Sequence, residues 1–121
     1  MKARFALQRG VLAATLLFAS GVAAVAAHTT RFWNLTANTI TVLQLAPAGT
    51  ATFGPDQCKN DKDGSVEHDE RMKVSGVSSG SYDIKFTDAK GRSCTVKNVA
   101  VKEGDVFSLD EKQLGGGACQ P

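Results

Sequence analysis

Residues 80–109 read GSYDIKFTDAKGRSCTVKNVAVKEGDVFSL, which is three strand-like runs separated by two turns. In the first run (YDIKF) large apolar residues alternate with polar ones, as in a strand with one buried face. The sequences DAKGR and EGD are typical of tight turns. The stretch therefore predicts strands over 82–86, 93–101 and 106–109 that follow one another as a meander.

The preceding part of the chain continues this pattern of short strands. Residues 30–45 (TRFWNLTANTITVLQL) are rich in β-branched and aromatic types, and Asn38 is placed to bend the chain between two strands. Residues 71–77 predict another short strand. Residues 46–70, between these two strand-like segments, contain Pro and Gly at intervals and are interpreted as a loop. The length of this loop suggests a function.

Six or seven short strands, regular turns and no convincing helical period indicate an all-β fold. The predicted architecture is a small antiparallel β-sandwich, immunoglobulin-like or transthyretin-like in outline, with a long acidic loop over 56–70. The strands fall in one small domain, 28–121, of about 94 residues. A domain of this size often relies on a disulfide, a metal or a partner. Trp33, in the first strand, is expected to lie in the core.

Residues 1–27 have the pattern of an export signal. A basic start is followed by an apolar, Ala-rich run and by small residues that suit a signal peptidase, with cleavage after Ala26 or Ala27. Ser20 and Gly21 interrupt the apolar run, and no basic stop-transfer flank follows, so a membrane span is not expected. The sequence predicts a periplasmic protein that has no membrane attachment once the signal peptide is removed.

Loss of the signal changes the charge balance and narrows the possible functions. Three basic residues leave with it, so the formal net charge falls from +2 to −1. The remaining Lys and Arg residues are scattered singly, without an aromatic platform beside a cationic groove, which argues against nucleic acid as a partner. With two His, no GxSxG motif and no visible acid and base pair, the chain is not expected to be an enzyme.

Three cysteines, Cys58, Cys94 and Cys119, lie in the part of the chain that is expected to be exported, where disulfides form. No CxxC motif is present, so thiol oxidoreductase chemistry is not expected. Cys94, within a predicted strand, is expected to pair with Cys58 or with Cys119, and the spacing does not choose between them. The third thiol is then buried, links two chains or acts as a soft ligand.

The segment 56–70 reads DQCKNDKDGSVEHDE and holds six of the twelve acidic residues of the chain. These six are Asp56, Asp61, Asp63, Glu67, Asp69 and Glu70. The DKDG sequence and the final Glu fall on positions 3 to 6 and 12 of a calcium loop of EF-hand type, with Lys59 where the first ligand should be. Pro55 before the loop and the strand-like MKVSGV after it indicate an insertion between strands rather than an EF-hand domain.

Carboxylates spaced this closely repel one another, and an ion of charge two or three relieves that repulsion. The first-choice metal ligands are Asp61, Asp63 and Glu70, followed by Asp69, Glu67 and Asp56. Gly64 would permit the sharp turn, and Ser65 would offer its backbone carbonyl. The competing interpretation is a solvated surface loop in which Lys59, Lys62 and Arg71 pair with the carboxylates.

Several stretches resemble a known group of proteins. They are RFWNLT (31–36), LQLAPAGT (43–50), CKNDKDGSVEHDER (58–71), YDIKF (82–86) and GRSCTVKNVAVKEGDVFSL (91–109). Over residues 31–112 the chain resembles the small exported β-domain proteins of alphaproteobacteria that include the landiscernin-like, periplasmic lanthanide-binding proteins. NDKDG with HDER is the more specific part of the match. The resemblance implies lanthanide handling in methylotrophic metabolism, with trivalent ions bound by carboxylates and at a dimer interface.

Other partners remain open from the residues alone. Six carboxylates suit a trivalent lanthanide better than calcium, which is the alternative ion. A single small loop leaves coordination positions that a second chain could fill, so a metal-linked homodimer is a further hypothesis. Cleavage after Ala27 would make His28 the N-terminus, and with His68 it could bind copper. A metal-free interaction module would instead dock a basic partner, and its binding would be unaffected by a chelator.

Overall fold

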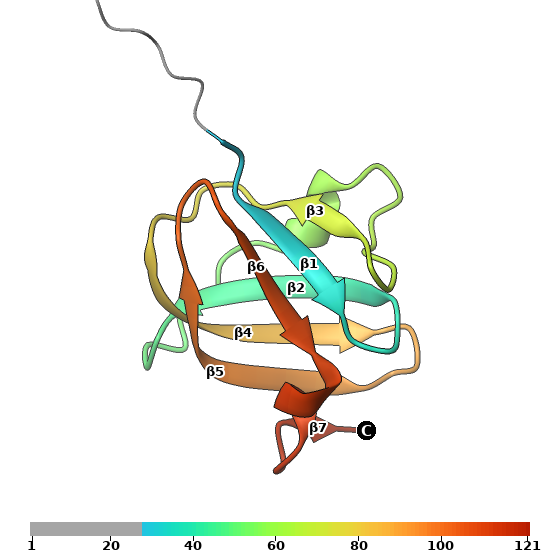
Figure 1. Ribbon diagram of the computed structural model, residues 1–121. Helices are drawn as coiled ribbons and strands as arrows, with labels where there is room; N and C mark the ends of the chain where they lie inside the picture. The colour runs from blue at the N-terminus through green and yellow to red at the C-terminus, as the bar shows by residue number, and fades with distance from the viewer. Residues whose placement is uncertain (1–27) are drawn as a thin grey trace, which may run out of the picture.

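The computed structural model describes residues 28–121, so the predicted signal peptide at 1–27 lies outside the described residues (Figure 1). In chain order the elements are β1 (Arg31–Leu35), β2 (Ile40–Pro47), the 3-10 helix η1 (Gln57–Asn60), β3 (Arg71–Lys73), β4 (Gly80–Asp88), β5 (Ser93–Val101), β6 (Val106–Asp110), the 3-10 helix η2 (Glu111–Leu114) and β7 (Cys119–Gln120). Within this part of the chain, no helix has the length and apolar character of a membrane span.

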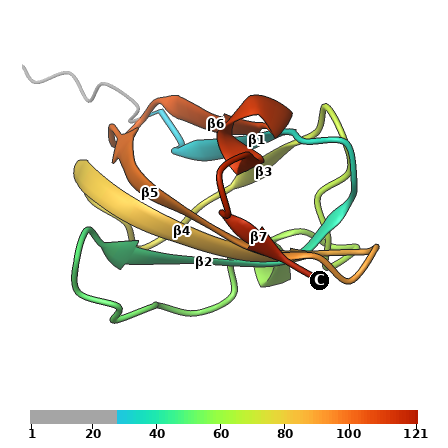
Figure 2. The same ribbon diagram turned by 90° about the horizontal axis from the view of Figure 1, so that it is seen from below.

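The strands form two sheets that pack face to face. One sheet has the order β3-β1-β6, and the other has the order β2-β4-β5-β7. Seen end-on in Figure 2, the two sheets are separate layers joined at their edges by loops. The predicted small β-sandwich is confirmed, with one difference: β1 and β6 pair in parallel, whereas the other pairs are antiparallel.

The strands lie close to where the sequence pattern predicts them. The predicted strand 93–101 is β5, with the same bounds, and the bend at Asn38 separates β1 from β2. The predicted strand 71–77 is shorter, because regular pairing with β1 ends at Lys73. The predicted loop 46–70 begins after Pro47 and contains η1, together with an isolated bridge between Val66 and Ile40.

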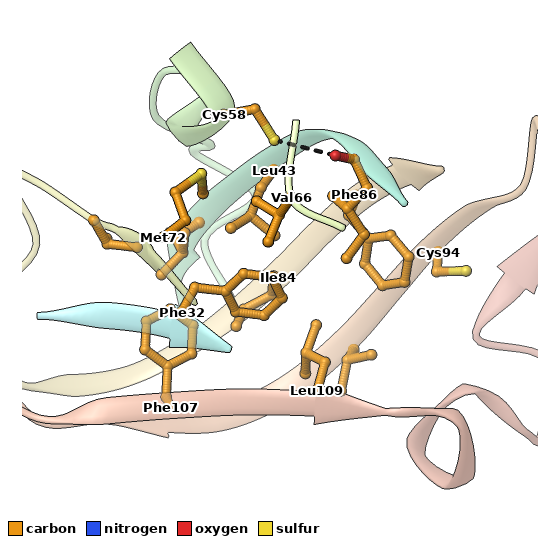
Figure 3. Packing of buried hydrophobic residues seen from close by; sticks show 14 of the residues in the cluster. Phe32, Leu43, Cys58, Val66, Met72, Ile84, Phe86, Cys94, Phe107 and Leu109 are labelled. Atoms are coloured by element: carbon orange, nitrogen blue, oxygen red, sulfur yellow. Dashed lines mark hydrogen bonds between the residues drawn. The ribbon is translucent and has the colours of Figure 1, made fainter. Parts of the chain in front are cut away.

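The core lies between the two sheets and is built from the inward-facing residues of the strands. Phe32 from β1 and Phe107 from β6 pack with their ring centroids 5.5 Å apart, facing Ile84 and Phe86 of β4 (Figure 3). Each buried side chain of this size contributes about 1.5–3 kcal/mol. Cys58 and other loop residues also belong to the core cluster, so the acidic loop is partly built into the sandwich.

Candidate functional site

The acidic loop begins at Asp56, whose carboxylate joins it to the edge of the second sheet. One carboxylate oxygen, Oδ1, accepts hydrogen bonds from the backbone N–H of Leu43 and from that of Cys58, each at 2.9 Å. The first bond satisfies a donor on the open edge of β2, and the second caps the N-terminus of η1. Asp56 is therefore a structural residue at the entry to the loop.

Two buried residues then fix the loop to the core. The Cys58 side chain is fully buried, and its Sγ lies 3.7 Å from the Ile40 carbonyl oxygen. Val66 is fully buried as well, and its backbone N–H and C=O both pair with Ile40 at 2.9 Å. Figure 3 shows both side chains pointing toward the core from the loop side. Residues 59–65 therefore form a surface segment that is fixed to the core at each end, by Cys58 and by Val66.

The tip of this surface segment has the turn that the sequence predicts. The Asp61 carbonyl accepts a hydrogen bond from the Gly64 N–H at 3.0 Å, and its Oδ2 accepts one from the Asp63 N–H at 2.9 Å. Gly64 has φ +74°, a conformation that glycine adopts without strain. Asp63 is exposed, and its own carboxylate accepts no hydrogen bond within the described residues. The tip thus presents one free and one singly bonded carboxylate to solvent.

The end of the loop folds against β1. Glu70 accepts a hydrogen bond from the Glu67 N–H at 2.7 Å, and Asp69 accepts one from the Trp33 indole N–H at 2.9 Å. Asp69 has φ +68°, which is unusual for a residue other than glycine. Its backbone N–H donates to the Asn34 carbonyl, which holds it in that conformation. Glu67 is exposed.

Trp33 is the residue whose place was predicted wrongly. It is half-buried on the outer face of the sheet rather than in the core, because its neighbours Phe32 and Asn34 take the inward positions. The alternation of a strand allows only one of two consecutive aromatics to face inward. The adjacent pair Phe32–Trp33 therefore indicated that one of the two faces outward, but not which one.

The six predicted ligands do not form one ready-made site. Among residues 28–121, no three His, Cys, Asp or Glu side chains gather in a way that could hold a metal ion. The loop nevertheless concentrates charge: burial of the Cys58 thiol, and then the negative charges of Asp56, Asp61 and Glu70, raise the pKa of that thiol to about 12. Carboxylates from the start, middle and end of the loop thus act on one sulfur.

These carboxylates have no ion-pair partners in the described part of the chain. The salt bridges found there join Arg92 to Asp88 at 2.8 Å and Arg92 to Glu111 at 2.9 Å, away from the loop. Neither Lys59 nor Lys62 forms one, and the guanidinium carbon of Arg71 lies 3.9 Å from the centroid of the Trp33 ring. The expected pairing of the loop carboxylates with Lys59, Lys62 and Arg71 is not observed.

The two His residues lie at opposite ends of β1. His28 precedes the strand and contacts Gly104, whereas His68 Nδ1 lies 2.7 Å from the carbonyl oxygen of Thr36, beyond the end of the strand. The five residues of β1 alone span roughly 17 Å. The structure does not bring these two imidazoles together, so it gives no support to a copper site that uses both of them.

The disulfide joins Cys94 to Cys119, which is one of the two pairings left open by the sequence. It ties β7 to β5, where the two cysteines are opposite each other in the antiparallel register. Cys58 is the free cysteine, and it is buried. Of the three roles considered for the third thiol, burial is the one observed.

The free thiol is expected to be unreactive in the folded protein. Because the pKa of Cys58 is raised to about 12 and the side chain is buried, almost no thiolate is present or accessible at pH 8. A disulfide-exchange reagent such as Ellman's reagent should release no colour from the native protein and one equivalent after denaturation in urea. Rapid labelling of the native protein at pH 8 would contradict the burial of Cys58.

No protein-family model, no curated protein and no solved structure matches this chain.

Proposed function

We propose that this protein binds a hard cation, a trivalent lanthanide in the first place, through the acidic loop 56–70, and that it handles or delivers that ion outside the cytoplasm. The observation that carries the proposal is the absence of any ion pair to the six loop carboxylates among the described residues. A surface loop with this charge density would gain from neutralisation, and a multivalent cation supplies it most directly.

The available oxygen atoms support this choice of ion. An ionised carboxylate has two oxygens and about four lone-pair sites, so one accepted hydrogen bond leaves most of its capacity free. Asp61 and Glu70 each accept one bond from a backbone N–H, and Asp63 accepts none within the described residues. Besides the structural Asp56 the loop has five carboxylates, and this number favours a charge of three over a charge of two, which ranks a lanthanide above calcium.

Binding requires a local rearrangement, and its cost is small. The carboxylates of Asp61 and Glu70 would turn away from the N–H groups of Asp63 and Glu67, and both of these hydrogen bonds lie at the protein surface. Each such bond contributes about 1 kcal/mol, and the released N–H can bond to water. The anchors at Cys58 and Val66 lie on either side of the tip and need not move.

Terbium luminescence offers a direct test, because Trp33 is the only Trp in the chain and its indole is bonded to Asp69 in the loop. Excitation of Trp33 should sensitise terbium emission in the chelator-stripped protein lacking residues 1–27, and lanthanum should displace the signal. The variant Asp61→Asn/Asp63→Asn/Glu70→Gln should weaken terbium binding by about a hundredfold, since affinity follows the number of charged ligands.

A matched variant distinguishes the loss of specific ligands from a general loss of negative charge. Glu103→Gln/Asp105→Asn/Asp110→Asn removes the same number of acidic groups outside the loop, and Asn at 110 can still cap η2. Its terbium affinity should equal that of the wild type. Equal, tight binding by the loop variant and the wild type would refute the assignment of the loop, and a preference for calcium over lanthanum would refute the choice of ion.

A further inference from the structure

A pocket of about 290 Å³ lies at the end of the sandwich where β2 ends and β4 begins. One wall is the loop after β2, and the other is the loop between β3 and β4 (Figure 1). Most of the lining surface is apolar and comes from Leu45, Pro47, Pro55, Val77 and Tyr82. None of the described residues in the lining carries a formal charge at pH 7. The pocket is therefore suited to an uncharged and largely apolar molecule.

One polar side chain of the lining, Gln57, is only 4% exposed. Its Oε1 accepts hydrogen bonds from the Ser75 N–H at 3.0 Å and from the Asn60 side-chain amide at 2.7 Å. Its Nε2 donates to the Ser75 carbonyl at 3.0 Å. An amide nitrogen has two N–H groups, and the second has no partner among the described residues. This second N–H is directed away from Ser75, and the pocket is the unfilled space that Gln57 borders.

Hydrogen bonds hold both walls of the pocket in place without a ligand. The Gly54 N–H donates to a carbonyl of β2 at 2.9 Å, which keeps the first loop on that strand. The paired bonds between Gln57 and Ser75 join the first loop to the second. The Tyr82 hydroxyl donates to the Ser78 carbonyl at 2.8 Å, which fixes the second loop to β4. A pocket that is already formed loses little conformational freedom on binding.

We infer that this pocket binds a small, uncharged organic molecule with an apolar body and one carbonyl oxygen, to which the second N–H of Gln57 donates. A buried donor without a partner costs free energy, and an acceptor on a ligand removes that cost. The volume of about 290 Å³ is at the lower end for ligand pockets, so the ligand is smaller than a typical drug. A charged molecule would lose its hydration without meeting an opposite charge in the lining, which disfavours it.

The pocket is independent of the proposed metal function, because no carboxylate lines it. Binding is therefore measured in excess EDTA, where the result does not depend on whether the acidic loop holds an ion. The probe is acetophenone, which joins a ketone oxygen to a small apolar body. In ¹⁵N-labelled protein lacking residues 1–27, acetophenone should shift the NMR signals of the Gln57 side-chain amide and the Gly76 N–H, with a Kd of about 1 mM or tighter. The signal of Gly91, in the turn after β4, should not move.

A matched ligand and a matched variant test the hydrogen bond itself. The ligand α-methylstyrene has the shape of acetophenone but a CH₂ group in place of the ketone oxygen. The Gln57 side-chain proton should shift downfield with acetophenone and not with α-methylstyrene. Gln57→Met keeps the length of the side chain but removes the donor. The preference of the wild type for acetophenone, as a ratio of the two Kd values, should fall by at least about tenfold in this variant.

Two blocking variants locate the site. Val77→Trp fills the pocket from the second loop, and Thr52→Trp fills it from the first, where the exposed Thr52 can be changed without touching the core. Each should weaken acetophenone binding by at least about tenfold. The control Val106→Trp adds the same ring at an exposed position of β6 outside the lining, and should keep the wild-type Kd.

Three results would overturn the inference. The first is that acetophenone shifts no signal of the lining at concentrations up to about 10 mM. The second is that Gln57→Met keeps the wild-type ratio of Kd values, or that the Gln57 proton responds equally to both ligands. The third is that Thr52→Trp and Val77→Trp, shown by circular dichroism to be folded, both bind acetophenone as tightly as the wild type.

Discussion

Replacing Asn34 by Ala is expected to destabilise the domain by about 3 kcal/mol or more, the largest effect of any single substitution considered. The Asn34 side chain is fully buried. Its Nδ2 donates to the carbonyls of Asn38 and Val66 at 3.0 and 2.9 Å, and its Oδ1 accepts from the backbone N–H of Thr36 at 2.9 Å and from the Thr36 hydroxyl at 2.6 Å. Alanine would leave the buried Thr36 N–H without a partner. Urea unfolding followed by circular dichroism measures the loss.

A second amide serves as the control for this substitution. Asn60 also donates two side-chain hydrogen bonds, to Gln57 and to the Lys73 carbonyl, but it is exposed and water can replace them. Asn60→Ala should therefore cost less than about 1 kcal/mol. Equal urea midpoints for Asn34→Ala and Asn60→Ala would contradict this role of Asn34, in which its buried side chain joins β1 to the bend after it and to the acidic loop.

Loss of the disulfide is expected to cost about 3.5 kcal/mol. Cys94 and Cys119 are separated by 25 positions, and closing a loop of that length removes this much chain entropy from the unfolded state. The double variant Cys94→Ala/Cys119→Ala should therefore unfold at a clearly lower urea concentration than the oxidised wild type. Both chains should keep the same β-rich spectrum before unfolding, because β7 contributes only two residues to the sheet.

Reductant distinguishes the disulfide from a packing effect of the substitution. Dithiothreitol should lower the midpoint of the wild type toward that of the double variant and should leave the variant unchanged. The free Cys58 is common to both proteins and cancels in the comparison. A wild-type midpoint that does not respond to dithiothreitol, once reduction is confirmed by mass, would show that the cross-link contributes nothing to stability.

The strands were predictable because their signals are local. Alternation over YDIKF and the turn DAKGR mark β4 and the start of β5 from the chain alone. Periodicity indicates which face of a strand is buried, but it does not indicate which strand lies beside it. The parallel pairing of β1 with β6 was not predictable for this reason, because it joins segments more than 70 positions apart. That pairing, and the outward position of Trp33 that accompanies it, depend on the packing of the whole sandwich.

The acidic loop was predictable in chemical type but not in detail. The spacing of DKDG predicted a turn at Gly64, and its φ of +74° confirms this. The spacing carried no information on how the loop carboxylates use their oxygens. Backbone N–H groups of β2 and of the loop itself donate to Asp56, Asp61 and Glu70, and the Trp33 indole on β1 donates to Asp69. Which donors reach them is decided by tertiary structure.

The two core anchors of the loop make it part of the cooperative unit that unfolds globally. Because Cys58 and Val66 are buried in the same cluster as Phe32 and Ile84, residues 59–65 cannot detach at both ends while the sandwich stays intact. Any ligand of the loop would then raise the free energy of global unfolding, by about 2.7 kcal/mol at a hundredfold excess over Kd. The amide proton of Val66, bonded to Ile40, would report this as slower hydrogen exchange limited by unfolding of the entire domain.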